Sequence, residues 1–134
     1  MKFLSIKTLC FAMCSLSFIS NTFADQIDVT KRTILKPSET IQLNLDDILL
    51  IDVRTQKEWD DGHIKGATHL PLKDFKNKLS EVAPDHSQAI VVYCSQGGRA
   101  IAATKYMNNL GYRAVPVVNG GYLLMLSAGH QNSK

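Results

Sequence analysis

The residues best suited to chemistry form a short loop, Cys94-Ser95-Gln96-Gly97-Gly98-Arg99. Glycines let successive backbone N–H groups turn inward, which makes a concavity suited to an anion. A helix that starts after the loop adds its positive end, and Arg99 either adds a full charge or braces the loop. These groups favour the thiolate, which is the nucleophilic form of cysteine. We therefore expect Cys94 to be a nucleophile that acts on a small anionic substrate.

Each feature of this loop also has a structural explanation when it is taken alone. A free cysteine is often a small buried hydrophobic residue, two glycines make an ordinary turn, and an arginine is often a surface charge. Their combination at the end of an expected strand favours a functional site. The candidate residues are Cys94 as the catalytic nucleophile and, for substrate binding, Ser95, Gln96, Gly97, Gly98 and Arg99.

Three apolar runs predict the strands that place this loop. Residues 48–53 and 89–93 read as strands buried on both faces, and 115–118 is a shorter run in which Pro116 marks a sheet edge or a strand end. Residues 33–35 are compatible with a short edge strand. Cys94 follows the second run directly, at the carboxyl end of a strand, where ligand sites of open α/β sheets lie.

Two amphipathic patterns between these runs predict helices. The first places Leu72, Phe75, Leu79 and Val82 on one face, between Pro71 and Pro84. The second repeats the pattern with Ala100, Ala103, Met107 and Leu110, and Gly111 ends it. Alternation of strands and helices predicts an α/β fold with a mostly parallel central sheet flanked by helices.

The N-terminus has the layout of a secretory signal. Lys2 and Lys7 accompany an apolar run over residues 9–19 that is too short to span a bilayer, and Thr22 and Ala24 suit the positions before a cleavage site. We expect residues 1–24 to be cleaved and residues 25–134 to form one domain that is exported to the periplasm. Two of the three cysteines then leave with the signal, so Cys94 becomes the only thiol of the mature chain.

Charge gives no sign of a polyanionic partner. Without Lys2 and Lys7, the 15 basic residues become 13 against 12 acidic residues. This near balance predicts no nucleic-acid partner and no membrane contact after cleavage. We expect the mature protein to be a monomer. His69, His86 and His130 have no metal-ligand spacing, so no metal site is expected.

Three motifs in order resemble the rhodanese-like sulfurtransferases over roughly residues 48–122. The first combines Ile51-Asp52-Val53-Arg54, Glu58-Trp59, Gly62-His63-Ile64-Lys65-Gly66-Ala67 and Leu70-Pro71; the second is the Cys94 loop; the third is Asn119-Gly120-Gly121. One departure is Tyr122-Leu123-Leu124-Met125-Leu126, because many members place a tryptophan a few residues after the closing glycines. Because of this departure, the resemblance does not predict which residues form the rim of the pocket.

The resemblance implies a rhodanese-like domain and transfer of sulfane sulfur in two steps. The Cys94 thiolate takes the outer sulfur of thiosulfate, sulfite leaves, and a thiol or cyanide accepts the sulfur from the Cys94 persulfide. N–H groups from Ser95 to Arg99 would stabilise the anionic species. The resemblance implies no metal and no organic cofactor.

Two alternatives use the same loop. Phosphatases and arsenate reductases with rhodanese-like folds carry one more residue between cysteine and arginine than the four present in this chain, whose smaller loop suits a sulfur atom better. A carrier that hands on a persulfide without turnover, or a sensor of oxidants, needs the same activated thiol. The sequence does not separate these last two from a sulfurtransferase.

The other polar residues of the first motif are expected to be structural. Asp52 can accept backbone N–H bonds at a strand end, and Arg54 can pair with Glu58. His63 is expected to order a turn, and Trp59 is expected to anchor the core. The tail, residues 129–134, is expected to be frayed.

Overall fold

The structure is a computed structural model that describes residues 27–134. The expected signal segment, residues 1–24, lies outside the described residues. Helices, 3₁₀ helices and strands follow in the order η1 (Val29–Lys31), β1 (Ile34–Leu35), α1 (Pro37–Thr40), β2 (Leu49–Asp52), α2 (Gln56–Asp61), β3 (His63–Ile64), β4 (Thr68–His69), η2 (Leu72–Asp74), α3 (Phe75–Val82), β5 (Ile90–Tyr93), α4 (Gly98–Asn109), β6 (Val117–Val118), α5 (Gly121–Ser127) and β7 (Asn132–Ser133).

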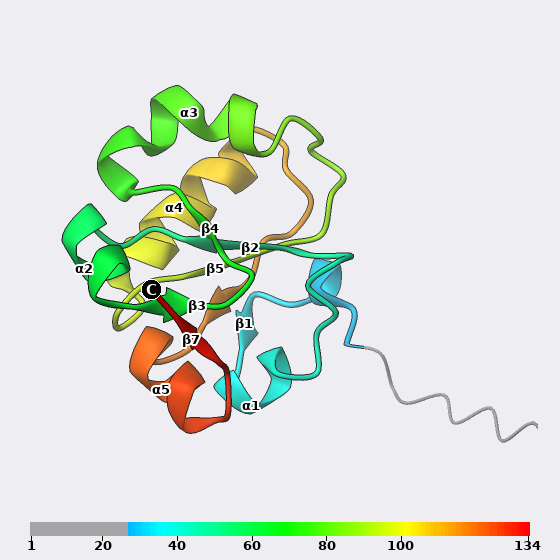
Figure 1. The fold of residues 1–134 in the computed structure, drawn as a ribbon. Helices are drawn as coiled ribbons and strands as arrows, with labels where there is room; N and C mark the ends of the chain where they lie inside the picture. The colour runs from blue at the N-terminus through cyan, green and yellow to red at the C-terminus, as the bar shows by residue number, and fades with distance from the viewer. Residues whose placement is uncertain (1–26) are drawn as a thin grey trace, which may run out of the picture.

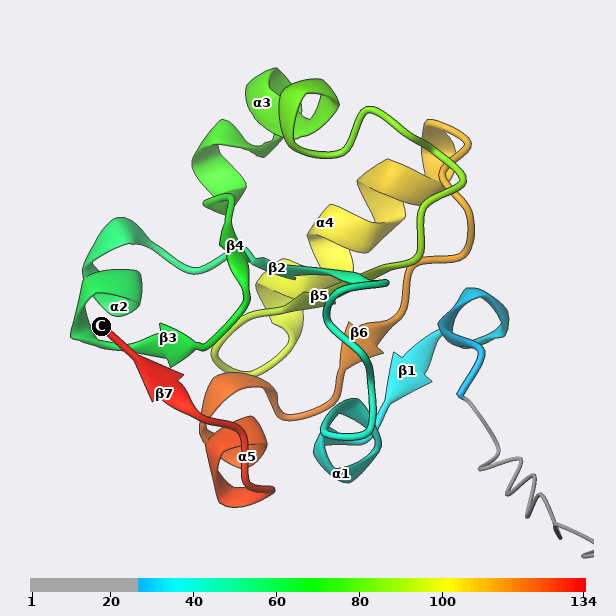
Figure 2. The ribbon, with the colours of Figure 1, turned by 45° about the vertical axis from the view of Figure 1, so that its right-hand side comes forward.

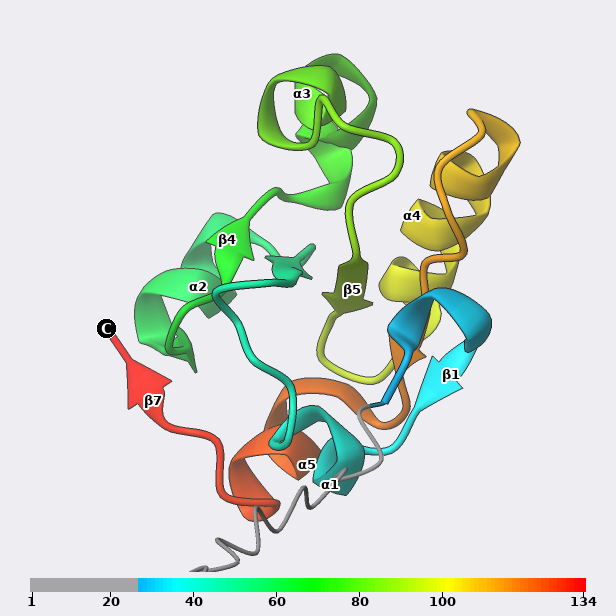
Figure 3. The same cartoon turned by 90° about the vertical axis from the view of Figure 1, so that its right-hand side faces the viewer.

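Within residues 27–134, five strands form one sheet in the order β1-β6-β5-β2-β4, and all neighbours are parallel (Figure 1). The register sets Asp52 beside Tyr93 at the ends of β2 and β5. Helices cover both faces: Figure 3 shows α3 and α4 on one side and α1 and α5 on the other. The expected fold class, an α/β fold with a mostly parallel central sheet, is confirmed.

The two faces of β2 and β5 divide the core. Ile51, Val53, Val92 and Cys94 pack with α3 and α4, whereas Leu50, Val91 and Tyr93 pack on the other side with residues such as Met125 of α5. These strands are buried on both faces, which explains their uninterrupted apolar runs. The side chain of Cys94 therefore faces the α3 and α4 side of the sheet.

Several expected elements differ in extent. The 3₁₀ helix η2 precedes α3, so Leu72 stands outside the regular helix. Leu110 was expected on the buried face of its helix, but it caps α4 and is 47% exposed. Pro116 precedes β6, an interior strand of the sheet, so it marks a strand end and not an edge. Gly111 has φ +84°, as expected of a residue that ends a helix.

The expectation of a frayed tail is wrong. Strand β7 pairs antiparallel with β3, and Figure 2 shows this pair beside α2. His63 lies opposite Ser133, and the backbone N–H of Lys65 donates to the carbonyl of Gln131 at 2.9 Å. These hydrogen bonds hold the C-terminal residues against the segment that follows α2.

Candidate functional site

The Cys94 loop begins where β5 ends and finishes where α4 begins. The N–H of Val53 donates to the carbonyl of Tyr93 at 3.1 Å, which continues the pairing of β2 and β5 up to Cys94. Cys94 therefore lies beside Val53 at the carboxyl edge of the sheet, as the sequence predicts.

The sulfur of Cys94 is bound to the loop that follows it. Its Sγ accepts a hydrogen bond from the backbone N–H of Gly97 at 2.9 Å, and Cys94 is 1% exposed. Gly97 has φ +113°, a conformation that side-chain-bearing residues rarely adopt, at the turn from loop to helix. The N-terminus of the 12-residue helix α4 follows, so both its dipole and the N–H favour negative charge on sulfur.

Arg99 braces the loop against α2. Its guanidinium donates to both carboxylate oxygens of Glu58, at 2.6 and 2.8 Å, and to Oγ of Ser95 at 2.7 Å. Bidentate pairing of this kind fixes orientation as well as charge. Hydrogen bonding to Glu58, opposed by burial, raises the pKa of Arg99. Of the two roles expected for Arg99, bracing is the one seen.

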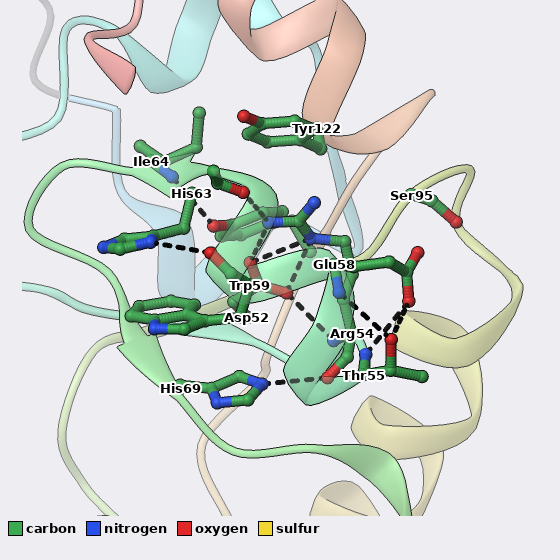
Figure 4. Close-up of polar contacts among 12 residues, drawn as sticks. Asp52, Arg54, Thr55, Glu58, Trp59, His63, Ile64, His69, Ser95 and Tyr122 are labelled. Carbon is green, nitrogen blue, oxygen red and sulfur yellow. Dashed lines mark hydrogen bonds and ion pairs between the residues drawn. The ribbon is translucent and has the colours of Figure 1, made fainter. Parts of the chain in front are cut away.

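Glu58 serves a second purpose as a helix cap. Its Oε2 also accepts the N–H and hydroxyl of Thr55, at 3.0 and 2.7 Å, which completes a capping box at the start of α2 (Figure 4). The hydrogen bonds from Arg99, together with those from Thr55 and against the effect of burial, lower the pKa of Glu58 to about 2. Glu58 is therefore ionised throughout the neutral range.

Arg54 does not pair with Glu58, contrary to the expectation from sequence. It points inward, where Nε and Nη2 bind the carboxylate of Asp52 at 2.7 to 3.0 Å and Nη2 also donates to the carbonyl of Gly62. Asp52 also accepts the N–H of Arg54 at 2.9 Å, in line with its expected role at the strand end. Asp52 is 0% and Arg54 3% exposed, so this ion pair is buried where β2 ends.

The turn after β6 packs directly on the Cys94 loop. The N–H of Tyr122 donates to the carbonyl of Cys94 at 2.9 Å, and a Cβ at Gly121 would overlap the carbonyl oxygens of Cys94 and Ser95. The guanidinium carbon of Arg54 lies 3.9 Å from the centroid of the Tyr122 ring. Figure 4 draws both side chains. Tyr122 thus covers the buried ion pair.

Trp59 is not the core anchor expected from sequence, because it is only half-buried and belongs to neither core cluster. Its ring stacks on His63 and His69, with centroids 3.5 and 4.6 Å away (Figure 4). A ring nitrogen of each histidine lies within hydrogen-bond distance of a backbone carbonyl, that of Trp59 for His63 and that of Arg54 for His69. These contacts order the segments on either side of β3. Within residues 27–134, no group of three acidic, histidine or cysteine side chains is placed to hold a metal ion.

A pocket of about 380 Å³ opens beside the loop. It is lined by the segment from β2 into α2, by the start of η2 and by α4; the residues are Val53, Arg54, Thr55, Gln56, Lys57, Pro71, Leu72, Lys73 and Arg99. Another cavity, of about 310 Å³, includes Ile48 and Ala89 and so lies at the opposite, amino edge of the sheet.

The loop residues named from sequence lie together, but they differ in exposure. Gly97 is buried, Ser95 and Arg99 are half-buried, and Gln96 and Gly98 are exposed. Sequence reasoning missed that Glu58 supports the loop. The capping-box spacing from Thr55 to Glu58 places this carboxylate at the first turn of a helix, but it does not indicate the contact with Arg99.

Comparison with known proteins identifies the family. Residues 38–127 match the rhodanese-like domain. The thiosulfate sulfurtransferase PspE of Escherichia coli is 31% identical over 70 residues, which cover 52% of this chain and 67% of PspE. A sulfurtransferase of Allochromatium vinosum is 35% identical over 78 residues, covering 58% of this chain and 71% of the relative. The tRNA uridine(34) hydroxylase of Streptococcus suis is 32% identical over 109 residues, which cover 75% of this chain and only 33% of the hydroxylase.

Solved structures agree on the fold. A rhodanese-related protein from Thermoplasma volcanium superposes with a TM-score of 0.67 at 20% identity, covering 76% of this chain and 98% of the other. Thiosulfate sulfurtransferase from Pseudomonas aeruginosa superposes with a TM-score of 0.69 at 24% identity. The superposition covers 77% of this chain and 20% of the other. Since the family match spans most of the described residues and the sheet and loop agree with it, the chain belongs to the rhodanese-like sulfurtransferase family.

Proposed function

We propose that the protein is a thiosulfate sulfurtransferase in which Cys94 carries the transferred sulfur. The observation that supports this most is the 2.9 Å hydrogen bond from the N–H of Gly97 to the sulfur, at the N-terminus of α4. A sulfur held in this way is stabilised as a thiolate and is aimed at the cradle formed by the loop. Relatives named thiosulfate sulfurtransferase and sulfurtransferase support the same reaction.

In the first step, the Cys94 thiolate attacks the outer sulfur of thiosulfate. A bond forms between Sγ and that sulfur, the S–S bond of thiosulfate breaks, and its electron pair leaves with sulfite. The enzyme retains a persulfide anion, and we expect the backbone N–H groups from Ser95 to Arg99 to stabilise its charge; the N–H of Gly97 already donates to Sγ. In the second step, cyanide or a thiolate attacks the outer sulfur, and Cys94 leaves as thiolate.

The other chemistry considered for this loop is less well supported. A phosphatase or arsenate reductase needs space for a tetrahedral oxyanion and a guanidinium turned toward it. In this chain, the loop has four residues between cysteine and arginine, and Arg99 is paired with Glu58. The matched region is a third or less of each tRNA hydroxylase relative, so their activity does not transfer to this chain.

We further propose that residues 1–24 are a cleaved signal, that residues 25–134 are one domain and that the mature protein is periplasmic. The apolar run of residues 9–19 and the small residues before Asp25 support this. Within residues 27–134, none of the helices is long and apolar enough to cross a membrane. Sequencing the N-terminus of the protein from a periplasmic extract tests the proposal: a start at Asp25 supports it, and a retained Met1 contradicts it.

The decisive experiment is steady-state transfer from thiosulfate to cyanide by the chain that begins at Asp25. Thiocyanate should form with wild-type protein and not with Cys94→Ser, whose hydroxyl is a poor substitute for a thiolate. Intact mass after thiosulfate should rise by one sulfur atom and fall again with cyanide. Absence of the mass gain refutes the proposal, whereas a gain without turnover identifies a carrier.

A further inference from the structure

Strand β1 forms an outer edge of the five-stranded sheet, and Figure 2 shows it beside β6 at the end of the sheet. The carbonyl of Thr33 accepts a hydrogen bond from the N–H of Val117 at 3.0 Å, and the carbonyl of Leu35 accepts one from Asn119 at 2.9 Å. Because successive backbone groups of a strand point in opposite directions, the N–H and carbonyl of Ile34 face away from β6. Within residues 27–134, no strand pairs with this outer side of β1.

A groove of about 320 Å³ lies between β1 and α4, and the segment from Ala114 into β6 also lines it. Two exposed large apolar side chains face this groove: Ile34 of β1 is 55% exposed and Ile101 of α4 is 57% exposed. Leu35 is buried in the core cluster on the α5 side, so strand alternation places the side chain of Ile34 on the α4 side. The residues that line this groove are all different from those that line the pocket beside Cys94.

The groove has the length of a short extended peptide. Its α4 wall runs from Ile101 to Asn108, which is about 10 Å along a helix. Three residues of an extended chain cover about the same distance. A peptide laid along β1 can therefore pair its backbone with Ile34 and place one side chain on Ile34 and Ile101. Addition of a strand to an exposed sheet edge is a recurrent mode of peptide recognition.

The charge around the groove has one sign. Residues 29–38 include β1, and residues 100–118 include β6 and most of α4; together they contain no acidic residue and five basic residues, Lys31, Arg32, Lys36, Lys105 and Arg113. The first two form surface ion pairs with Asp28 and Glu39. Within residues 27–134, the other three form no ion pair. The surroundings of the groove are thus complementary to an acidic partner.

The same charges argue against two other occupants. An antiparallel pair of β1 strands from two copies, with Ile34 opposite Ile34, would set Arg32 of each copy opposite Lys36 of the other. Like charges directly opposite each other destabilise a strand pair, and basic residues on an edge strand commonly prevent self-pairing. Residues 1–26 carry two lysines and only one aspartate, so they do not complement the groove either.

We propose that the outer edge of β1 and the groove beside it bind an extended segment of a partner protein, in which an apolar residue has an acidic residue two positions away on each side. The backbone of the apolar residue pairs with the N–H and carbonyl of Ile34, and its side chain packs on Ile34 and Ile101. The acidic residues lie opposite Arg32 and Lys36, whose backbones are extended. This site is separate from the reaction at Cys94.

The probe is an acetylated and amidated peptide, Glu-Thr-Leu-Thr-Glu, titrated into the purified protein in an NMR experiment. The amide signal of Ile34 and the methyl signals of Ile34 and Ile101 should shift, and solvent exchange of the Ile34 amide should slow. The same peptide with an N-methylated leucine keeps every side chain and charge but cannot donate to the Ile34 carbonyl. It should bind about fivefold more weakly, as expected for the loss of one hydrogen bond.

A charge-reversed peptide tests the acidic flanks. Lys-Thr-Leu-Thr-Lys should bind about tenfold more weakly at low salt, because attraction at two surface positions becomes repulsion, and the difference should shrink as salt is added. These comparisons use unaltered protein, so they do not depend on the folding of a variant. Equal binding of the three peptides, or no shift with any of them, overturns the proposal.

Two matched variants of the α4 region locate the site. Ile101→Glu removes an apolar wall of the groove and adds a negative charge, and it should weaken peptide binding about tenfold. Leu110→Glu makes the same change at an exposed apolar residue that does not line the groove, and it should leave the affinity within about twofold of wild type. Equal effects of the two substitutions refute the assignment.

A lipid surface is the other ligand that suits basic and apolar side chains together. Vesicles that contain phosphatidylglycerol should not compete with the peptide for the Ile34 and Ile101 signals. Shifts with vesicles but not with the peptide would assign this surface to a membrane and overturn the proposal. Cys94→Ser should bind the peptide as wild type does, so a failure of the sulfurtransferase assay leaves this test intact.

Discussion

Arg99 and Glu58 lie 41 residues apart in the chain and form a bidentate ion pair with N–O distances of 2.6 and 2.8 Å. The same carboxylate caps α2 through Thr55, and the same guanidinium holds Ser95. One ion pair thus links the start of α2 to the loop that carries Cys94. Disturbing it is expected to affect both elements together.

Glu58→Gln should lower the free energy of unfolding by about 1 kcal/mol at neutral pH, a value reduced for the partial exposure of the pair. The pKa of Glu58 is about 2 in the folded protein against an ordinary 4.5, so the unfolded chain binds the proton first as pH falls. The stabilisation is complete above about pH 4.5 and is lost toward pH 2. Urea unfolding at several pH values should therefore show the two proteins converging below pH 4.5. Glu81→Gln, at an exposed position of α3, is the control, and a difference independent of pH argues against the pair.

Three glycine-to-alanine variants separate backbone strain from steric overlap. Gly121→Ala introduces both problems, because Gly121 has φ +64° and its new Cβ would overlap the carbonyl oxygens of Cys94 and Ser95. This variant should lower the free energy of unfolding by more than about 3 kcal/mol. Gly111→Ala has φ +84° but open space, and should cost about 1 to 2 kcal/mol. Gly98→Ala has neither problem and should change stability by less than about 0.5 kcal/mol. Thermal or urea unfolding gives the order; equal effects at Gly111 and Gly121 would exclude the contact with the loop.

Asp52→Asn should destabilise the protein by about 3 to 5 kcal/mol, because it leaves the guanidinium of Arg54 buried without a counter-charge. Asp61→Asn breaks an exposed pair with Lys57 and should change stability by less than about 0.5 kcal/mol. Denaturant unfolding measures both. Comparable losses in the two variants would mean that the Asp52 pair is solvated in solution.

Removal of residues 131–134 should lower the free energy of unfolding by about 1 to 2 kcal/mol, since it deletes the pairing of β7 with β3 and the 2.8 Å hydrogen bond from Tyr122 to Asn132. Hydrogen exchange of the Lys65 amide, which donates to Gln131, should accelerate in the shortened chain. Removal of Lys134 alone serves as the comparison. An unchanged exchange rate would indicate a tail that is loose in solution.

The sequence predicts the central strands and the position of Cys94 because burial on both faces leaves a strong local signal. The runs at 48–53 and 89–93 become β2 and β5 with shifts of one residue at their ends. Helix α2 was missed because none of its six residues is buried, so it has no apolar periodicity. Strands β3 and β7 have two residues each, and their pairing joins distant parts of the chain.

Contacts within the site were harder to predict than its location. Arg54 and Glu58 have the spacing of an ion pair on one helix, but Arg54 precedes α2 and turns into the core toward Asp52. Because Arg54 pairs with Asp52, the carboxylate of Glu58 is available to form its ion pair with Arg99. Spacing along the chain describes neighbours on a single element, whereas these partners are selected by the way separate elements pack.

The parallel sheet also has a consequence for how the chain folds. No two neighbouring strands among the five can form as a hairpin, so each pairing closes a long loop before hydrogen bonds compensate for the lost entropy. Sheets of this kind nucleate slowly compared with helical bundles of similar size. Cys94 is 1% exposed in the native state, and it becomes buried only when β2, β5 and α4 have assembled. A nascent chain therefore presents an accessible thiol until assembly, and refolding yields should depend on the redox buffer.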